Sequence, residues 1–189
     1  MTFNPEIHHR RSIRLRNYDY ASGGAYFVTL CIIDRGCYFE EFPRLREIVN
    51  NEWNNLPTRF PNVELDEYII MPNHFHGIII CRDTPCGYPT NGHSSENPGH
   101  PQGDAPTLGE IIGAFKSLCV TAWLKEIKTD AINARGKFWQ TNYYEHVIRN
   151  EDEMNRIRQY IIDNPARWEL DMENPTPRGL QQQLEKWMI

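Results

Sequence analysis

Apolar residues cluster in three short stretches of the first half of the chain, and each stretch predicts a β-strand. Residues 26–33 are rich in β-branched and aromatic side chains and follow a Ser-Gly-Gly turn signal, which is typical of a buried strand. Residues 63–71 predict a second strand and residues 74–81 a third. Pro72 and Asn73 lie between these two strands and form a turn signal, so the pattern predicts an antiparallel hairpin.

Apolar residues at helical spacing predict three longer helices. Residues 43–56 place their apolar side chains three and four positions apart, with a proline in the first turn, where proline is tolerated. Residues 108–127 repeat the same spacing. A third helix begins at Asn150, which suits an N-cap, and we expect it to end near Asp163 because Pro165 disfavours helical geometry at the preceding residue.

The order of these elements predicts the fold class. Residues 138–148 are aromatic and mixed, which favours a further strand or an extended segment. The chain is therefore predicted to be α+β, with an antiparallel sheet of four to five strands and helices packed mainly on one face. Residues 82–107 hold five prolines and four glycines, which predicts a long mobile loop. We expect one domain over residues 1–170 and a C-terminal tail with a short helix over residues 171–189.

Composition and charge exclude several classes of protein. Hydrophobic residues make up 40% of the chain and aromatic residues 12%, which is a globular rather than a disordered composition. No apolar run approaches the roughly 20 residues that cross a bilayer, and the first residues lack the apolar core of a signal peptide. We therefore expect a cytoplasmic protein without a membrane partner. The formal net charge of -5 argues against a broad basic surface for duplex DNA.

The positive charge is nevertheless concentrated near the N-terminus. Four arginines and no acidic residue lie between residues 8 and 16, namely Arg10, Arg11, Arg14 and Arg16. Such a segment is able to bind phosphate groups as a local arm. Composition alone favours a solvated segment equally.

Two histidines at the start of the third predicted strand form a candidate metal site. Side chains alternate along a strand, so His74 and His76 point to one face while Phe75 points to the other. Two imidazoles on a rigid strand bind divalent metals and leave positions open for a substrate oxygen. Two polar residues at an exposed strand end would show the same pattern.

A second pair of polar side chains lies on the last predicted helix. Tyr160 and Asn164 are one turn apart and share a helix face. A tyrosine hydroxyl can serve as a covalent nucleophile, and an amide oxygen is a ligand that hard cations accept. Taken alone, the pair also fits an aromatic residue at the core edge and a residue that terminates the helix.

These motifs together resemble the REP-associated tyrosine transposases, which belong to the single-tyrosine branch of the HUH transposases of small insertion sequences. The resemblance spans roughly residues 10–167, with its motifs in the same order. The matching stretches are Arg-Arg-Ser-Ile-Arg-Leu at 10–15, Gly-Ala-Tyr-Phe-Val-Thr at 24–29, His-Phe-His at 74–76, Phe-Trp-Gln at 138–140, Tyr-Glu-His-Val-Ile-Arg-Asn at 144–150 and Tyr-Ile-Ile-Asp-Asn-Pro at 160–165.

The resemblance implies a ferredoxin-like HUH nuclease fold, a homodimer and a substrate of single-stranded DNA with hairpins. It implies that His74, His76 and Asn164 hold a divalent metal, Mg²⁺ or Mn²⁺. Tyr160 would attack the DNA and form a 5′-phosphotyrosine intermediate, which allows cleavage and rejoining.

Other assignments stay open at the level of sequence. Besides the N-terminal arginines, we expect Lys137, Trp139 and Arg149 to contact DNA. Tyr144 and His146 are alternatives for the nucleophile or a metal ligand. Two other classes of function also fit: a catalytically reduced DNA-binding descendant, and a metal-dependent phosphoesterase that hydrolyses DNA without a covalent intermediate.

Overall fold

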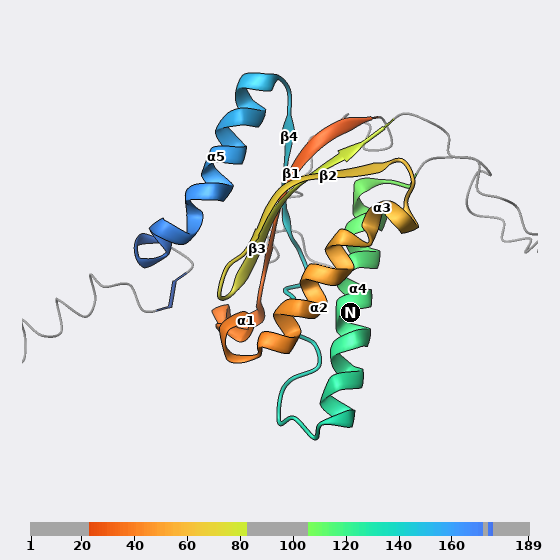
Figure 1. The fold of residues 1–189 in the computed structure, drawn as a ribbon, viewed down its shortest axis with the longest axis vertical. Helices are drawn as coiled ribbons and strands as arrows, with labels where there is room; N and C mark the ends of the chain where they lie inside the picture. Colours follow the sequence, from red (N-terminus) through yellow and green to blue (C-terminus); the bar gives the residue numbers. More distant parts are fainter. Residues whose placement is uncertain (1–22, 83–105, 172–173, 176–189) are drawn as a thin grey trace, which may run out of the picture.

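A four-stranded sheet with helices on both faces makes up the protein in our computed structural model, which describes residues 23–82, 106–171 and 174–175 (Figure 1). The strands and the three longer helices follow the predicted order. In chain order the elements are β1 (Gly24–Cys31), η1 (Ile33–Arg35), α1 (Tyr38–Glu41), α2 (Pro43–Asn54), α3 (Leu56–Arg59), β2 (Val63–Ile70), β3 (His74–Cys81), α4 (Leu108–Thr129), β4 (Tyr144–Ile148), α5 (Glu151–Arg167) and η2 (Trp168–Leu170).

The strands form a single antiparallel sheet in the order β2-β3-β1-β4. The predicted hairpin is β2 and β3, and the hydrogen bond from the Met71 amide to the His74 carbonyl closes its turn. In the centre of the sheet, Thr29 of β1 pairs with His76 of β3. The α+β prediction with an antiparallel sheet is confirmed, at the lower end of the predicted strand number.

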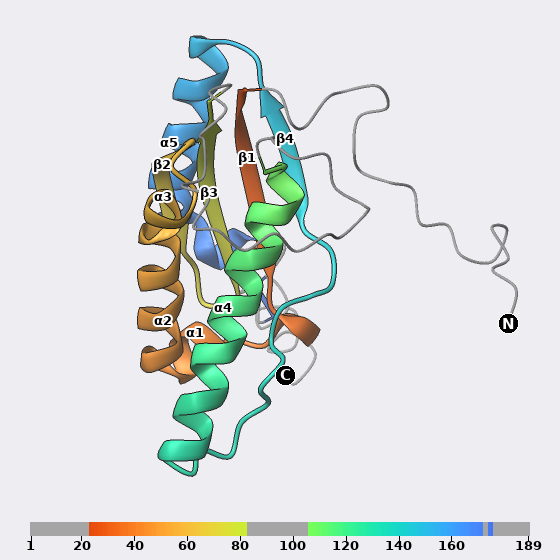
Figure 2. The ribbon, with the colours of Figure 1, turned by 90° about the vertical axis from the view of Figure 1, so that its right-hand side faces the viewer.

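Helices α2 and α4 pack together on one face of the sheet, and α5 crosses the opposite face (Figures 1 and 2). The face under α2 and α4 holds the larger core, which includes the fully buried rings of Trp53, Phe75 and Phe115. The second core under α5 is smaller and consists of Phe27, Ile78, Ile148, Met154 and Ile161. The larger helices α2 and α4 thus share one face as predicted, and α5 covers the face that carries the two histidines.

The glycine after the histidine pair is required by close packing on the larger core. A Cβ atom at Gly77 would lie 2.7 Å from a side-chain atom of Trp53 and 2.8 Å from one of Phe75. Any larger residue would therefore push the two aromatic rings away from β3. Because Gly77 is next to His76, this packing also holds the backbone of the candidate metal site in place.

The C-terminal end of α5 differs from the prediction. The helix continues through Pro165 to Arg167 instead of ending near Asp163. Proline removes one backbone donor and disfavours the helical conformation of the preceding residue, but it lies in the last turn, where packing outweighs this local cost. Asn164 is consequently helical and buried, one turn after Tyr160.

Several predictions concern segments outside the described residues. These are the arginine-rich segment at 8–16, nearly all of the proposed loop at 82–107 and most of the proposed tail at 171–189. In the parts of the chain that the structure covers, none of the helices has both the length and the apolar character needed to cross a membrane.

Candidate functional site

His74 and His76 lie side by side beneath α5. Their side chains are 1% and 5% exposed, and their ring centroids are 4.6 Å apart. Both imidazoles are on the face of β3 that carries Ile78, while Phe75 packs in the core on the other face. The expected alternation along the strand therefore brings the two histidines together.

Asn73 determines which nitrogen of His74 carries the proton. The amide nitrogen of the Asn73 side chain donates to the Arg35 carbonyl at 3.1 Å, so its oxygen faces Nδ1 of His74 at 2.9 Å. A carbonyl oxygen only accepts hydrogen bonds, and this fixes the direction of both contacts. His74 Nδ1 therefore donates, and in the neutral imidazole Nε2 keeps its lone pair. Among the described residues, this buried Nε2 has no hydrogen-bond partner.

His76 is held between β1 and α5. Its Nδ1 lies 2.8 Å from the hydroxyl of Thr29, and its Nε2 lies 3.3 Å from the hydroxyl of Tyr160. Burial, with a smaller contribution from His74, lowers the pKa of His76 to about 3. Burial also lowers the pKa of His74, which the nearby Asp171 carboxylate partly opposes. Two neutral imidazoles are the form in which histidine binds metals.

Tyr160 stands at the entrance of this site. Its side chain is 41% exposed, and its ring contacts Phe27 and His76 edge-on, with centroids 6.0 and 5.3 Å away. Burial raises the pKa of the Tyr160 hydroxyl, while the hydrogen bond with the Asn164 side chain opposes the rise. The hydroxyl is therefore close to the histidines, while the side chain as a whole is partly exposed to solvent.

The unpaired atoms in this cluster fit a cation. Asn164 is 2% exposed, and its Oδ1, like Nε2 of His74, has no hydrogen-bond partner among the described residues. Buried acceptors without a donor are costly, and a cation in contact with them removes the cost. No three His, Cys, Asp or Glu side chains in the described segments are close enough to hold a metal by themselves. A metal at His74 and His76 therefore needs Asn164 or a carboxylate that moves toward it.

Asp171 is a member of the cluster that we did not expect from the sequence. Its Oδ2 lies 4.0 Å from Nε2 of His74. The 3-10 helix η2 turns the chain back toward β3 after α5, and the side chain of Asn174 donates to the Trp168 carbonyl within this turn. Asp171 lies beyond the end of α5 at Arg167, so the helical periodicity of the sequence could not place it near Tyr160.

The predicted DNA contacts have different outcomes. Lys137 and Arg149 are exposed and stay candidates. Trp139 is 2% exposed and packs against Phe39 and Phe138 in the larger core, so its assignment as a base-stacking residue is wrong. An isolated bridge pairs Trp139 with Ile32, directly after β1, and places its ring in this core. The four N-terminal arginines lie outside the described residues.

Tyr144 and His146 are on β4, at the edge of the sheet beside β1. Tyr144 is 48% exposed, and its ring meets Phe27 edge-on at 6.4 Å. His146 bonds through Nε2 to Glu153 at the start of α5, at 2.8 Å. In the structure it is Tyr160 and not Tyr144 that contacts His76, which makes Tyr160 the stronger candidate for a nucleophile.

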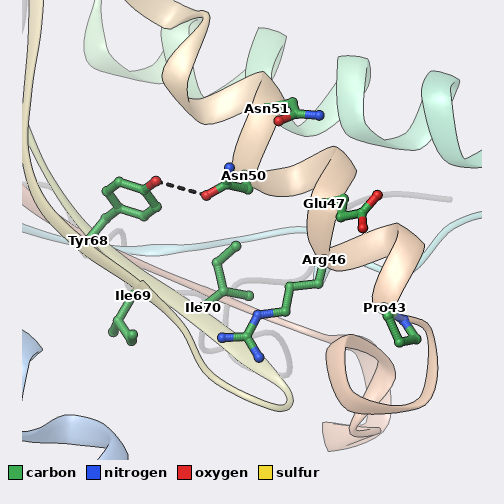
Figure 3. A pocket seen from close by; sticks show the side chains of 8 residues that line it. All are labelled: Pro43, Arg46, Glu47, Asn50, Asn51, Tyr68, Ile69 and Ile70. Carbon is green, nitrogen blue, oxygen red and sulfur yellow. Dashed lines mark hydrogen bonds between the residues drawn. The ribbon is translucent and has the colours of Figure 1, made fainter.

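A surface hollow lies elsewhere, between α2 and β2 (Figure 3). The Tyr68 hydroxyl donates to the Asn50 side chain across it at 2.8 Å. None of the predicted site residues lines this hollow, whose lining consists of Pro43, Arg46, Glu47, Asn50, Asn51, Tyr68, Ile69 and Ile70. The candidate catalytic and metal-binding residues thus lie at the interface of α5 with the sheet and not in this hollow.

Comparison with known proteins gives a close relative and a shared fold. No family model matches the chain. A protein of Haemophilus influenzae, described as uncharacterized, is 38% identical over 179 residues, which are 89% of this chain and 95% of the relative. The structure of a REP-associated tyrosine transposase bound to a REP hairpin matches with a TM-score of 0.50 and 20% identity, over 82% of this chain and 73% of that one. The chain therefore belongs to the same family as the Haemophilus influenzae protein and has the fold of the REP-associated tyrosine transposases.

Proposed function

We propose that this protein is a metal-dependent transposase and endonuclease that cleaves and rejoins single-stranded DNA through a 5′-phosphotyrosine intermediate. The observation that carries the proposal is the contact between the Tyr160 hydroxyl and Nε2 of His76, at 3.3 Å. It joins a partly exposed nucleophile to a buried pair of neutral imidazoles. The shared fold with a REP-associated tyrosine transposase supports the same assignment.

The chemistry requires a nucleophile that can also be a leaving group. The phenolic oxygen of Tyr160 attacks the phosphorus, the new O–P bond forms, and the bond from phosphorus to the 3′ oxygen breaks. Tyr160 loses one proton and the departing 3′ oxygen gains one. The phosphodiester energy is kept in the phosphotyrosine, so a 3′-hydroxyl can reverse the reaction and join the strands.

The chain's own residues prepare the site for a cation. His74 and His76 would hold it through Nε2, and Asn164 would add its amide oxygen. When bound, Mg²⁺ or Mn²⁺ supplies positive charge to a non-bridging phosphate oxygen. Because burial raises the pKa of Tyr160, positive charge beside its hydroxyl is also what would favour its ionised form.

The fold and the exposed charges support a proposal for the substrate class. The matching transposase structure is bound to a REP hairpin. We propose DNA hairpins with single-stranded flanks for this chain as well, with Lys137, Arg149 and the N-terminal arginines on the phosphates. We also propose that the protein is a homodimer and that it acts in the cytoplasm. Light scattering of the purified chain measures its oligomeric state.

The experiment incubates the protein with Mg²⁺ or Mn²⁺ and single-stranded DNA that carries a hairpin from the flanks of its own gene. A denaturing gel then separates a covalent protein–DNA adduct from free DNA. The variants are Tyr160→Phe, which removes the nucleophile, and Tyr144→Phe, which removes the other exposed tyrosine near Phe27.

An adduct that Tyr160→Phe abolishes and Tyr144→Phe retains is the expected result. Loss of the adduct only in Tyr144→Phe would transfer the role of nucleophile to Tyr144. Cleavage without an adduct would indicate a hydrolytic phosphoesterase. Binding of the hairpin without cleavage would indicate a DNA-binding descendant.

A further inference from the structure

The proposed metal site lacks negative charge if it consists only of the residues assigned so far. His74 and His76 are neutral, and the Asn164 amide carries no charge. Hard cations such as Mg²⁺ and Mn²⁺ are bound in proteins mainly by carboxylate and other oxygen ligands. A site with two imidazoles and one amide would therefore bind them weakly unless a nearby acidic side chain adds its charge.

Asp171 is placed to supply that charge. Its Oδ2 lies 4.0 Å from Nε2 of His74, which is too long for a hydrogen bond. The Asn73 side chain makes Nδ1 of His74 the donor, so the atom that faces the carboxylate is the lone pair on Nε2. Two acceptors thus face each other in a buried setting, with His74 only 1% exposed.

A cation between these two atoms would give His74 Nε2 the partner that it lacks and would be held by the negative charge of Asp171. Two ligands that each hold an ion at about 2.1 Å are roughly 3 to 4 Å apart, depending on the angle between them. The separation of 4.0 Å is at the upper end of this span. A small movement of the Asp171 side chain, which is 17% exposed, would bring it into contact.

We propose that Asp171 is the anionic ligand of the cation that His74 and His76 hold. This proposal rests on the metal dependence in the proposed function. It extends the site from α5, which carries the nucleophile, to the residue that directly follows η2.

The test measures metal binding separately from DNA cleavage. The full chain is stripped of metal and titrated with Mn²⁺ by calorimetry, and with Co²⁺ by visible absorption. The variants are Asp171→Asn, Asp171→Glu and, as a matched control, Glu169→Gln, which removes an exposed carboxylate from the same turn. Thermal melting in EDTA checks that each variant is folded.

Asp171→Asn should weaken Mn²⁺ binding at least tenfold and change the Co²⁺ spectrum, while its melting temperature in EDTA stays that of the unaltered chain. Glu169→Gln should bind Mn²⁺ normally, and Asp171→Glu should lose less affinity than Asp171→Asn. Equal Mn²⁺ affinity in Asp171→Asn and the unaltered chain would overturn the proposal and leave the histidine site intact.

A second measurement separates a metal ligand from a simple ion pair. Long-range ¹H–¹⁵N NMR of the metal-free protein at pH 7.5 should show a neutral His74 with its proton on Nδ1. A doubly protonated His74 would make Asp171 its ion-pair partner and would overturn the proposal. Normal Mn²⁺ binding without any DNA adduct would count against the proposed function alone, whereas no Mn²⁺ binding by the unaltered chain would overturn both.

Discussion

The hydroxyl of Tyr160 lies 3.3 Å from Nε2 of His76, although 84 positions of sequence separate the two residues. This contact depends on how α5 packs against the sheet. Met154 and Ile161 anchor the helix on Ile78 of β3, and Tyr160 reaches past Phe27 to the histidine. Whatever holds α5 on this face therefore also determines the distance between the nucleophile and the metal site.

The first prediction concerns Arg158, which fastens α5 to the edge strand β2. Its guanidinium donates two hydrogen bonds to Asp66, at 2.8 and 2.7 Å. Arg158→Gln should lower the melting temperature by about 2–4 °C, because a bidentate pair is lost between two elements. It should also slow adduct formation, since Tyr160 lies on the same helix. Arg44→Gln breaks exposed pairs with Glu47 of α2 and Glu126 of α4, neither of which involves α5. It should leave adduct formation unchanged and lower the melting temperature less than Arg158→Gln does.

An unchanged melting temperature in Arg158→Gln would mean that apolar packing alone holds α5. A lower melting temperature with normal adduct formation would mean that the position of Tyr160 does not depend on the Arg158–Asp66 pair.

The same pair predicts how stability depends on pH. Hydrogen bonds from Arg158 hold the pKa of Asp66 below its ordinary value of 3.8. The folded state thus binds a proton less readily than the unfolded state, so the pair stabilises the protein above pH about 4, and this contribution is lost as pH falls through the lower folded pKa. Urea unfolding at pH 7, 4 and 3 should show that the free energy of unfolding falls less steeply with decreasing pH in Asp66→Asn than in the unaltered chain.

The matched control for this pH effect is the double variant. In the Arg158→Gln background, Asp66→Asn should have a smaller influence on the acid slope, because the guanidinium is absent and only the hydrogen bond from the Glu67 amide still lowers the pKa of Asp66. An equal effect of Asp66→Asn in both backgrounds would show that another group governs Asp66.

A third prediction concerns the packing of Gly77. Gly77→Ala should lower the free energy of unfolding by about 1–3 kcal/mol, because its Cβ would collide with Trp53 and Phe75. Gly113→Ala is the control on α4, where a Cβ meets nothing within 4 Å. This change should raise the free energy of unfolding by about 0.4–1 kcal/mol, since alanine loses less backbone entropy in a helix. Denaturant unfolding measures both, and equal effects would contradict the packing argument.

The fourth prediction concerns Thr29, whose hydroxyl contacts Nδ1 of His76 at 2.8 Å. Thr29→Val keeps the shape of the side chain and removes this partner. We expect Mn²⁺ affinity to fall by roughly 10 to 100-fold, because partners of the distal nitrogen orient a ligating imidazole. Thr29→Ser keeps the hydroxyl and should bind nearly normally. Calorimetric titration measures the difference, and full affinity in Thr29→Val would show that packing alone orients His76.

Local signals in the sequence predicted most elements of the fold. Period-two and helical patterns indicated the strands and the three longer helices, and the Asn150 side chain does cap α5 by accepting from the Glu153 amide. Two local inferences were wrong for the same reason. Pro165 does not end α5, and Trp139 is a core residue, because tertiary packing outweighs a local preference and decides which aromatic rings are buried.

The sequence by itself determined that His74 and His76 share one face of a strand, and that Tyr160 and Asn164 share one face of a helix. Both follow from the repeat of the backbone, which needs no information from distant residues. Only the tertiary structure decided that these two faces meet, that Asn73 orients His74 and that Asp171 lies opposite it. Contacts between distant segments depend on how the apolar faces of α5 and the sheet pack. The local repeat of apolar residues in the sequence does not determine that packing.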